Sequence, residues 1–340
     1  MTSVSRDSAA AHGRDHEYEY DVVVVGGGPA GASTAVFTAR YGLDTVVFDR
    51  GRSSLQRCAH LENYLGFPAG IDIGTFYDLA HDHVEEAGCQ LRSDMVESVE
   101  RVDGADSTRF VVEPQEGEPV TTERVVAATR YDGEYLWSLG DDAMVTTHEH
   151  HDGEVEETFD DDYPGADSST PIDGLYVASP SDADEQAVIA AGRGAETGRT
   201  VIRDARLDIG IPAEFADHYD WVRREAELTG EWQDRDRWRE WFAAKVPDEH
   251  DFDPDELATL REAEIDRILD SYVDDEIIDR RRERGHGRLL DHLDSERILD
   301  YVDDEQVLDH LDDERILERA REIDGEDGEQ EFEESAEAGE

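Results

Sequence analysis

Residues 20–49 read YDVVVVGGGPAGASTAVFTARYGLDTVVFD. The unbroken apolar run at 22–25 predicts a parallel strand that is buried on both faces. A helix should follow over residues 29–41 and stop at a glycine, and a second apolar strand should occupy 45–48. This strand-helix-strand order predicts an α/β fold around a parallel sheet.

The turn after the first strand carries the spacing G-x-G-x-x-G. It is formed by Gly26, Gly28 and Gly31, and Pro29 suits the first helical turn, where its missing N–H would be unpaired anyway. Glycines here let the backbone approach a pyrophosphate, which the helix N-terminus then stabilises. Asp49, at the end of the second strand, stands where a carboxylate holds ribose hydroxyls. We therefore expect a dinucleotide site; the alternative is a glycine-rich turn in an ordinary strand-helix-strand unit.

The composition is extremely acidic. The chain has 340 residues and a formal net charge of -56, and Lys245 is its only lysine. Disorder would explain such a charge, but the apolar strands of the first half argue against it. Adaptation to molar salt fits better, because a Debye length of about 3 Å screens the self-repulsion. Nucleic acid is not expected as a partner, since the chain has no basic stripe.

The two cysteines, Cys58 and Cys89, make neither a disulfide framework nor a zinc site. The sequence contains no hydrophobic run of membrane length and no signal peptide. We therefore expect a cytoplasmic protein that has no membrane partner.

Further elements can be placed along the chain. Residues 1–19 are predicted to form a disordered tail. Residues 70–88 have apolar residues at helical spacing, including Tyr77 and His83 on the inward face, and residues 185–203 are also expected to be helical. Strands are expected at 89–91, 95–102, 109–112, 120–128 and 175–178, with a hairpin turn at 103–104.

This arrangement resembles the FAD domain of thioredoxin-reductase-like flavoproteins, within the pyridine nucleotide-disulfide oxidoreductases. The resemblance covers residues 20–129 and 171–203, and it includes the segment LENYLGFP at 61–68. It implies a Rossmann-like FAD-binding domain, with a parallel sheet plus β-meander, over 20–205. The residues that it implies for FAD binding are Gly26, Gly28, Pro29, Ala30, Gly31, Asp49, Asn63, Val96, Thr129, Ser179, Gln186 and Ala187.

The chain departs from the family pattern in three places. The family's A-T-G is Ala128-Thr129-Arg130 here, and the aspartate of its A-x-G-D is missing after Ala178, where Ser179 stands. The family's NAD(P)H domain, with a second glycine motif and a C-x-x-C pair, is replaced by a short insertion at 130–170. We expect an FAD-dependent oxidoreductase whose electrons come from diffusing NAD(P)H or from a redox protein. The alternative is a non-catalytic FAD- or nucleotide-binding interaction protein.

Three further features have competing interpretations. Cys58 lies near the flavin-facing segment and is a candidate redox thiol, although a small buried loop residue is the simpler interpretation. Cys89 is expected in the core. The cluster at 148–151 (His-Glu-His-His) could bind a metal, but a solvated loop is favoured and no metal site is predicted.

Residues 206–324 form an acidic region that is expected to be all-α and built from short helices. Trp238, Trp241 and Phe242 have helical spacing and should pack on neighbours. A nine-residue repeat begins at residues 289, 298, 307 and 316. Nine residues rotate a helix by about 180°, so short helices capped by Asp294, Asp303 and Asp312 fit better than one long helix. These helices are candidates for partner binding or self-association, and 325–340 should be disordered.

Overall fold

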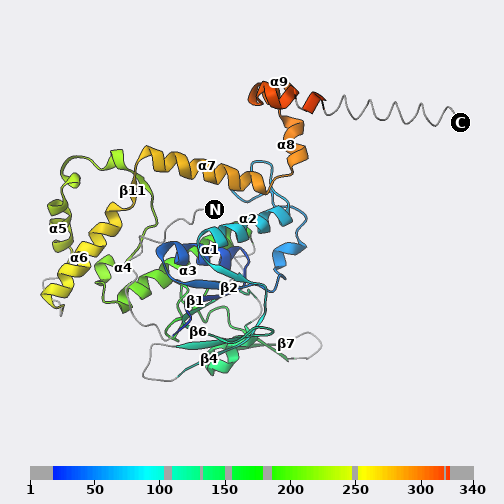
Figure 1. Ribbon diagram of the computed structural model, residues 1–340. Coiled ribbons are helices and arrows are strands. Elements are labelled where there is room, and N and C mark those ends of the chain that lie inside the picture. Colours follow the sequence, from blue (N-terminus) through cyan, green and yellow to red (C-terminus); the bar gives the residue numbers. More distant parts are fainter. Residues whose placement is uncertain are drawn as a thin grey trace. The chain divides into compact units, whose positions relative to one another are not determined.

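The computed structural model describes residues 18–102, 109–130, 133–149, 155–178, 186–246, 252–317 and 319–321. The chain divides into two compact units, Met1–Glu283 and Arg284–Glu340. The first unit is built on a seven-stranded sheet with the order β3-β2-β1-β6-β5-β4, in which β9 also pairs with β6 (Figure 1). The parallel strands are β1 (Tyr20–Val25), β2 (Thr45–Phe48), β3 (Gln90–Arg92), β6 (Val120–Ala127) and β9 (Leu175–Val177). This confirms the expected Rossmann-like α/β fold.

The predicted β-meander is also present. It runs antiparallel from β4 (Val96–Arg101) through β5 (Phe110–Pro114) into the first residues of β6. The second half of β6 pairs instead with β9, in parallel. The hairpin turn predicted at 103–104 lies outside the described residues.

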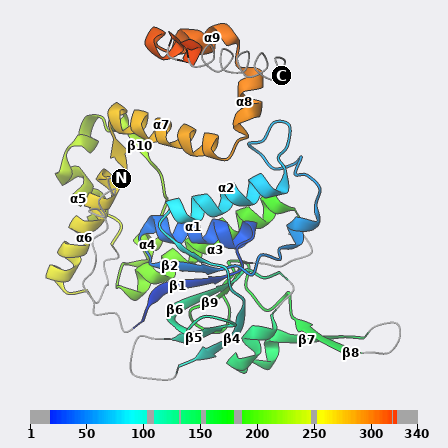
Figure 2. The same ribbon diagram turned by 45° about the vertical axis from the view of Figure 1, so that its right-hand side comes forward.

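Alternate residues of β1 face two different cores. Val22 and Val24 pack under the helices α1 (Pro29–Tyr41), α2 (Ile73–Glu86) and α3 (Ala187–Asp208). Val23 and Val25 face the meander and the residues that follow β6. The helices therefore form one layer over the sheet, and the meander covers the other face (Figure 2). Burial on both faces explains why the strand reads as an unbroken valine run.

The insertion between β6 and β9 contains structure that the sequence analysis did not predict. Two short 3-10 helices, Glu134–Leu139 and Asp142–Met144, precede an antiparallel hairpin of β7 (Val145–Glu149) and β8 (Val155–Phe159). The solvated loop expected around residue 148 is therefore wrong for 145–149, where three consecutive β-branched residues, Val145-Thr146-Thr147, favour a strand. The side chains of the cluster at 148–151 lie outside the part of the chain that the structure describes.

The helices α4 (Ala213–Ala216), α5 (Arg235–Ala243) and α6 (Pro254–Leu269) complete most of the first unit. The aromatic spacing did predict packing among neighbours: the rings of Phe215 and Phe242 stack with their centroids 4.1 Å apart, and Trp238 is buried. Two strands of two residues each, β10 (Arg223–Arg224) and β11 (Tyr272–Val273), pair in parallel. The helix α7 (Asp275–Asp291) follows, so α6 and α7, with 16 and 17 residues, exceed the short helices expected.

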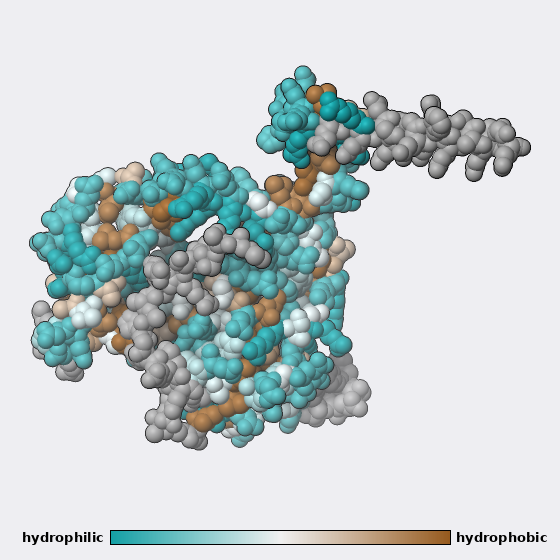
Figure 3. Space-filling view, viewed as in Figure 1, coloured by the Kyte–Doolittle hydropathy of each residue, from teal (hydrophilic) through white to brown (hydrophobic). Residues whose placement is uncertain are grey.

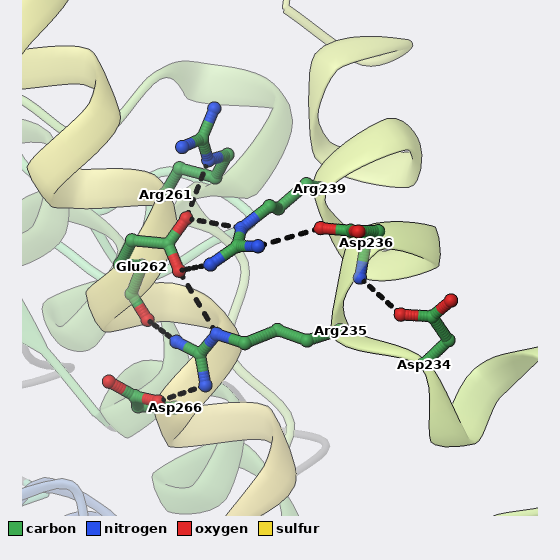
Figure 4. A network of polar contacts seen from close by, with 7 residues as sticks. All are labelled: Asp234, Arg235, Asp236, Arg239, Arg261, Glu262 and Asp266. Atoms are coloured by element: carbon green, nitrogen blue, oxygen red, sulfur yellow. Dashed lines mark hydrogen bonds and ion pairs between the residues drawn. The ribbon is translucent and has the colours of Figure 1, made fainter.

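Charged side chains join α5 to α6. Glu262 on α6 accepts hydrogen bonds from Arg235, Arg239 and Arg261, and Arg235 also reaches Asp266 (Figure 4). The Arg239 hydrogen bonds are the main cause that lowers the pKa of Glu262 to about 2. These groups are partly exposed, so the network fixes the orientation of the two helices more than it adds stability.

A buried ion pair attaches α6 to α3. Arg206 is 1% exposed and donates to Glu264 (2.9 Å), to the carbonyl of Phe215 (2.7 Å) and to the Tyr41 hydroxyl (3.1 Å). Burial acts to raise the pKa of Glu264, but hydrogen bonds and charge from Arg267 and Arg206 outweigh it and leave the pKa below its usual range. One guanidinium thus connects three elements far apart in sequence.

The nine-residue repeats of the second unit form capped short helices, as predicted. Asp294 accepts from the N–H groups of Glu296 and Arg297 at the start of α8 (Ser295–Tyr301). Asp303 caps α9 (Asp304–His310), and Asp312 accepts from the Arg315 N–H at 2.9 Å. Several large apolar side chains of the described repeats are exposed, namely Leu293, Leu299, Tyr301, Leu308 and Leu317. Figure 3 shows brown areas on the mostly hydrophilic surface of this unit.

Among the described residues, no helix combines the length and the apolar content needed to cross a bilayer.

Replacing Arg206 should destabilise the first unit. Arg206→Met leaves Glu264, the Phe215 carbonyl and the Tyr41 hydroxyl without this donor, and breaking a buried pair costs about 3 kcal/mol. The control is Arg203→Met on the same helix, where an exposed pair with Asp217 (3.4 Å) should contribute less than about 1 kcal/mol. Denaturant unfolding followed by circular dichroism measures both; equal unfolding midpoints would contradict this role of Arg206.

Candidate dinucleotide site

The turn between β1 and α1 requires glycine at two positions. Gly26 has φ of +109°, and a Cβ there would lie 2.5 Å from the Ala128 carbonyl oxygen. At Gly31 a Cβ would lie 1.8 Å from the Gly26 carbonyl oxygen. The N–H of Gly26 donates to the Phe48 carbonyl (2.8 Å), which joins the turn to the end of β2. Side chains at these two positions would separate α1 from the sheet.

The third motif glycine faces open space. Gly28 is the N-cap of α1, and the only atom that its Cβ would approach is the Ser53 hydroxyl oxygen at 3.5 Å. No side chain of the described residues caps this helix end, and its first turn, which begins Pro29-Ala30, contains no acidic residue. The N–H groups of this turn can therefore bind an anion that approaches past Gly28.

Asp49 lies beside the turn, as predicted. Its Oδ1 accepts from the Gly51 N–H (3.1 Å), and its Oδ2 lies 3.4 Å from His81 Nε2. The carboxylate packs against Gly27, where a Cβ would lie 2.6 Å from the Asp49 Cβ. Its side chain is 13% exposed, so a bound ribose would meet a carboxylate already held in place.

The segment 61–68 lies against the start of α3. Asn63 Nδ2 donates to Gln186 Oε1 (2.6 Å), so two residues that are 123 positions apart and that the sequence predicted for one site are brought together. Leu61 and Ala187 are buried in one small cluster with Phe76. Gln186 is the N-cap of α3, and its side chain makes no cap hydrogen bond among the described residues.

Val96 is buried at the start of β4, next to a cavity. The cavity measures about 340 Å³ and is lined by Arg50, Arg52, Ser93, Asp94, Met95, Gln115 and Glu116. Two of the lining residues, Arg50 and Arg52, belong to the segment that follows Asp49 in the chain.

The residues after β6 keep the shape of the turn despite the missing glycine. Arg130 adopts φ of +63°, a conformation that favours glycine, and its Nη1 donates to Ser54 Oγ (3.2 Å). Thr129 Oγ1 lies 3.1 Å from the Tyr135 hydroxyl. Ser179 lies outside the described residues.

The two cysteines lie in different environments. Cys58 is exposed, so its interpretation as a small buried residue is wrong, because the segment turns outward after the 3-10 helix Ser54–Arg57. Cys89 is buried, as predicted; burial raises the pKa of its thiol to about 12.

In the described part of the chain no three His, Cys, Asp or Glu side chains gather as metal ligands would.

Sequence reasoning missed two residues on α2. Tyr77 and His81 lie four residues apart on the face toward the glycine turn, with ring centroids 5.6 Å apart. The periodicity placed His83 on the inward face, but His83 is exposed and His81 is half-buried. The i, i+4 spacing of Tyr77 and His81 was the available signal. It does not distinguish a binding site from a core, because tyrosine and histidine also occur on the inward face of amphipathic helices.

Comparison with known proteins agrees with this geometry. Residues 20–134 match the family described as pyridine nucleotide-disulphide oxidoreductase. A bifunctional thioredoxin reductase/thioredoxin of Mycobacterium leprae is 38% identical over 87 residues, which are 25% of this chain and 19% of that protein. A thioredoxin reductase of Listeria monocytogenes is 44% identical over 50 residues, 14% of this chain and 16% of that protein. The chain thus spans about a fifth of the length of these relatives.

Solved structures of similar shape include a thioredoxin reductase from Gloeobacter violaceus, with a TM-score of 0.44 and 18% identity, covering 61% of this chain and 98% of that one. Another is the T. acidophilum thioredoxin reductase, with a TM-score of 0.42 and 17% identity, covering 56% and 99%. The fold assignment rests on the strand order and on the match of residues 20–134. Those residues match the pyridine nucleotide-disulphide oxidoreductase family, and segments of the chain are similar in sequence to thioredoxin reductases.

Proposed function

We propose that this protein is an FAD-dependent oxidoreductase. The observation that carries the proposal is the turn at Gly26, Gly28 and Gly31, where two glycines are sterically required and the third leaves an uncapped helix end facing open space. A pyrophosphate fits such an end, and Asp49 beside it fits a ribose. Gly26 and Gly31 permit the close packing of the turn, while the open helix end at Gly28 and the carboxylate beside it suit a dinucleotide.

Each part of the site has a distinct task in this proposal. The first turn of α1 binds the pyrophosphate through N–H groups, and Asp49 accepts hydrogen bonds from ribose hydroxyls. The joined Asn63 and Gln186 hold the segment 61–68 and the start of α3 together, where the helix N-terminus favours negative charge. A bound flavin would supply the hydride and single-electron chemistry, and the protein would orient it.

The electron donor is proposed to be diffusing NAD(P)H or a redox protein. The described residues between β6 and β9 form two 3-10 helices and a hairpin, which contain no second strand-helix-strand unit. The exposed Cys58 is the candidate redox thiol, since no C-x-x-C pair occurs in the sequence.

A second candidate is a non-catalytic FAD-binding interaction protein. It is favoured by Leu299 on α8 and Leu308 on α9, which are more than half exposed, and by the lack of any fully buried residue in these two helices. These helices would bind a redox partner or a second copy of the chain. A net charge of -56 suggests that either association occurs in concentrated salt, in a cytoplasm adapted to it.

Loss of the Asp49 carboxylate should weaken FAD binding. Asp49→Ala removes a hydrogen bond to a charged group, which contributes about 1.5–3 kcal/mol. Titration in molar salt, followed by flavin fluorescence, measures the affinity. Asp21→Ala is the control, because Asp21 accepts from the Asp44 N–H (2.8 Å) at the end of β1 far from the turn. A folded wild-type chain that neither carries FAD nor takes it up would refute the proposed cofactor.

NADPH-dependent reduction of thioredoxin by this chain alone should be weak or absent, because the insertion replaces the domain that would bind NADPH and carry the C-x-x-C pair. Anaerobic mixing with NADPH, followed by flavin absorbance, shows whether the cofactor is reduced at all. Reduction without turnover of thioredoxin supports a diffusing donor, and no reduction by NADPH or by an artificial donor favours the second candidate. Efficient thioredoxin turnover would contradict our account of the insertion.

Lowering the salt concentration should loosen the second unit before the first. At about 0.01 M ionic strength the Debye length is about 30 Å, so the acidic repeats repel one another, and their exposed leucines offer little burial in compensation. The first unit has two buried cores and gains stability from bound cofactor. Circular dichroism should therefore report helix loss at a higher salt concentration than that at which flavin fluorescence reports release. A single coincident transition would count against this order of events.

A further inference from the structure

The helix α2 directs two polar side chains toward the glycine turn. Tyr77 and His81 share one face of the helix, and their rings meet edge to face. Neither residue belongs to the motif that identifies the dinucleotide site. His81 nevertheless contacts its two main parts, the glycine turn and Asp49, and Tyr77 lies one helical turn away.

The Tyr77 side chain is buried, with 8% of the residue exposed, and its hydroxyl has no hydrogen-bond partner of normal geometry among the described residues. Ser53, Asp49 and Cys58 are polar groups near enough to influence its pKa. Burial is the largest cause and raises this pKa to about 12, although Ser53 acts to lower it, so the phenol keeps its proton at neutral pH. A buried hydroxyl without a full hydrogen bond destabilises a protein, and such a group calls for an explanation.

His81 connects the same helix to the motif itself. Its Nε2 lies 3.1 Å from the Gly27 carbonyl oxygen and 3.4 Å from Asp49 Oδ2. His81 therefore fixes the distance between α2 and the glycine turn, and it limits the rotation of the Asp49 carboxylate. The Tyr77 hydroxyl, one helical turn earlier, lies near Ser53, whose hydroxyl oxygen would be 3.5 Å from a Cβ at Gly28.

We propose that Tyr77 is a binding residue of the dinucleotide site, whose hydroxyl donates a hydrogen bond to an oxygen of the adenosine diphosphate half of FAD, with His81 as the positioning residue for Asp49. This assignment rests on the proposed function. It explains the unpaired hydroxyl, because the missing acceptor is an oxygen of the ligand. It also explains why the donor is neutral and buried, since the adjacent helix end already supplies positive charge.

The test compares Tyr77→Phe with wild type in the full-length chain, in molar salt. Loss of the hydroxyl should weaken binding of FAD, and of ADP as a competitor, about fivefold or more. It should also raise the melting temperature of the cofactor-free protein by about 2 °C, because a buried unpaired group is removed. A residue with a purely structural hydrogen bond would lower the melting temperature instead.

Tyr20→Phe is the matched control. The Tyr20 hydroxyl is paired, donating to Gln90 (2.9 Å) and accepting from Arg92 (2.7 Å), and it lies at the opposite end of β1 from the turn. Its removal should lower the melting temperature and leave the FAD affinity unchanged. If wild type and Tyr77→Phe bind FAD with equal affinity, the assignment of Tyr77 is overturned and the proposed function is not affected. A wild-type chain that binds neither FAD nor ADP overturns the proposed function and the assignment with it.

Discussion

The first unit depends on how closely backbone can approach backbone at three glycines. Gly31 lies against the carbonyl of Gly26, and Gly194 of α3 lies against Ala30, where a Cβ would be 2.0 Å from the carbonyl oxygen. The Thr34 hydroxyl crosses the same contact and donates to the Gly194 carbonyl (2.9 Å). Sheet, α1 and α3 therefore stack with no side chain between them at this point. The open helix end at Gly28 exists because this stack fixes where α1 begins.

Local patterns predicted the elements of this stack because each of them is determined by neighbouring residues. The valine run, the proline at the first helical turn and the glycine stop at Gly42 give the bounds of α1 as observed, and Gly42 has φ of +108°. The hairpin β7–β8 was missed, since its polar, acidic composition resembles a loop and only pairing with a partner strand reveals it. The inward position of His81 was missed for a similar reason, because it depends on which carbonyl α2 meets.

In the candidate site, too, features determined by neighbouring residues could be predicted, whereas contacts between distant segments could not. Asp49 and the glycines could be predicted from spacing, since the turn and its acid lie within one strand-helix-strand unit. Gln186 could be placed by resemblance, but its contact with Asn63 joins segments that only the fold brings together. Arg130 shows how a departure from the family pattern can be accommodated: its backbone keeps the left-handed conformation, and its side chain gains Ser54 as a partner.

In the second unit, each described short helix is capped at its N-terminus by an aspartate of its own repeat. Each short helix begins at its own aspartate, and none of the described residues of α8 or α9 is buried. Gain or loss of one nine-residue unit would therefore leave the caps of its neighbours intact. The number of units can change through simple duplication in the gene without a compensating change elsewhere, so the reach and the total charge of this region can evolve independently of the dinucleotide site.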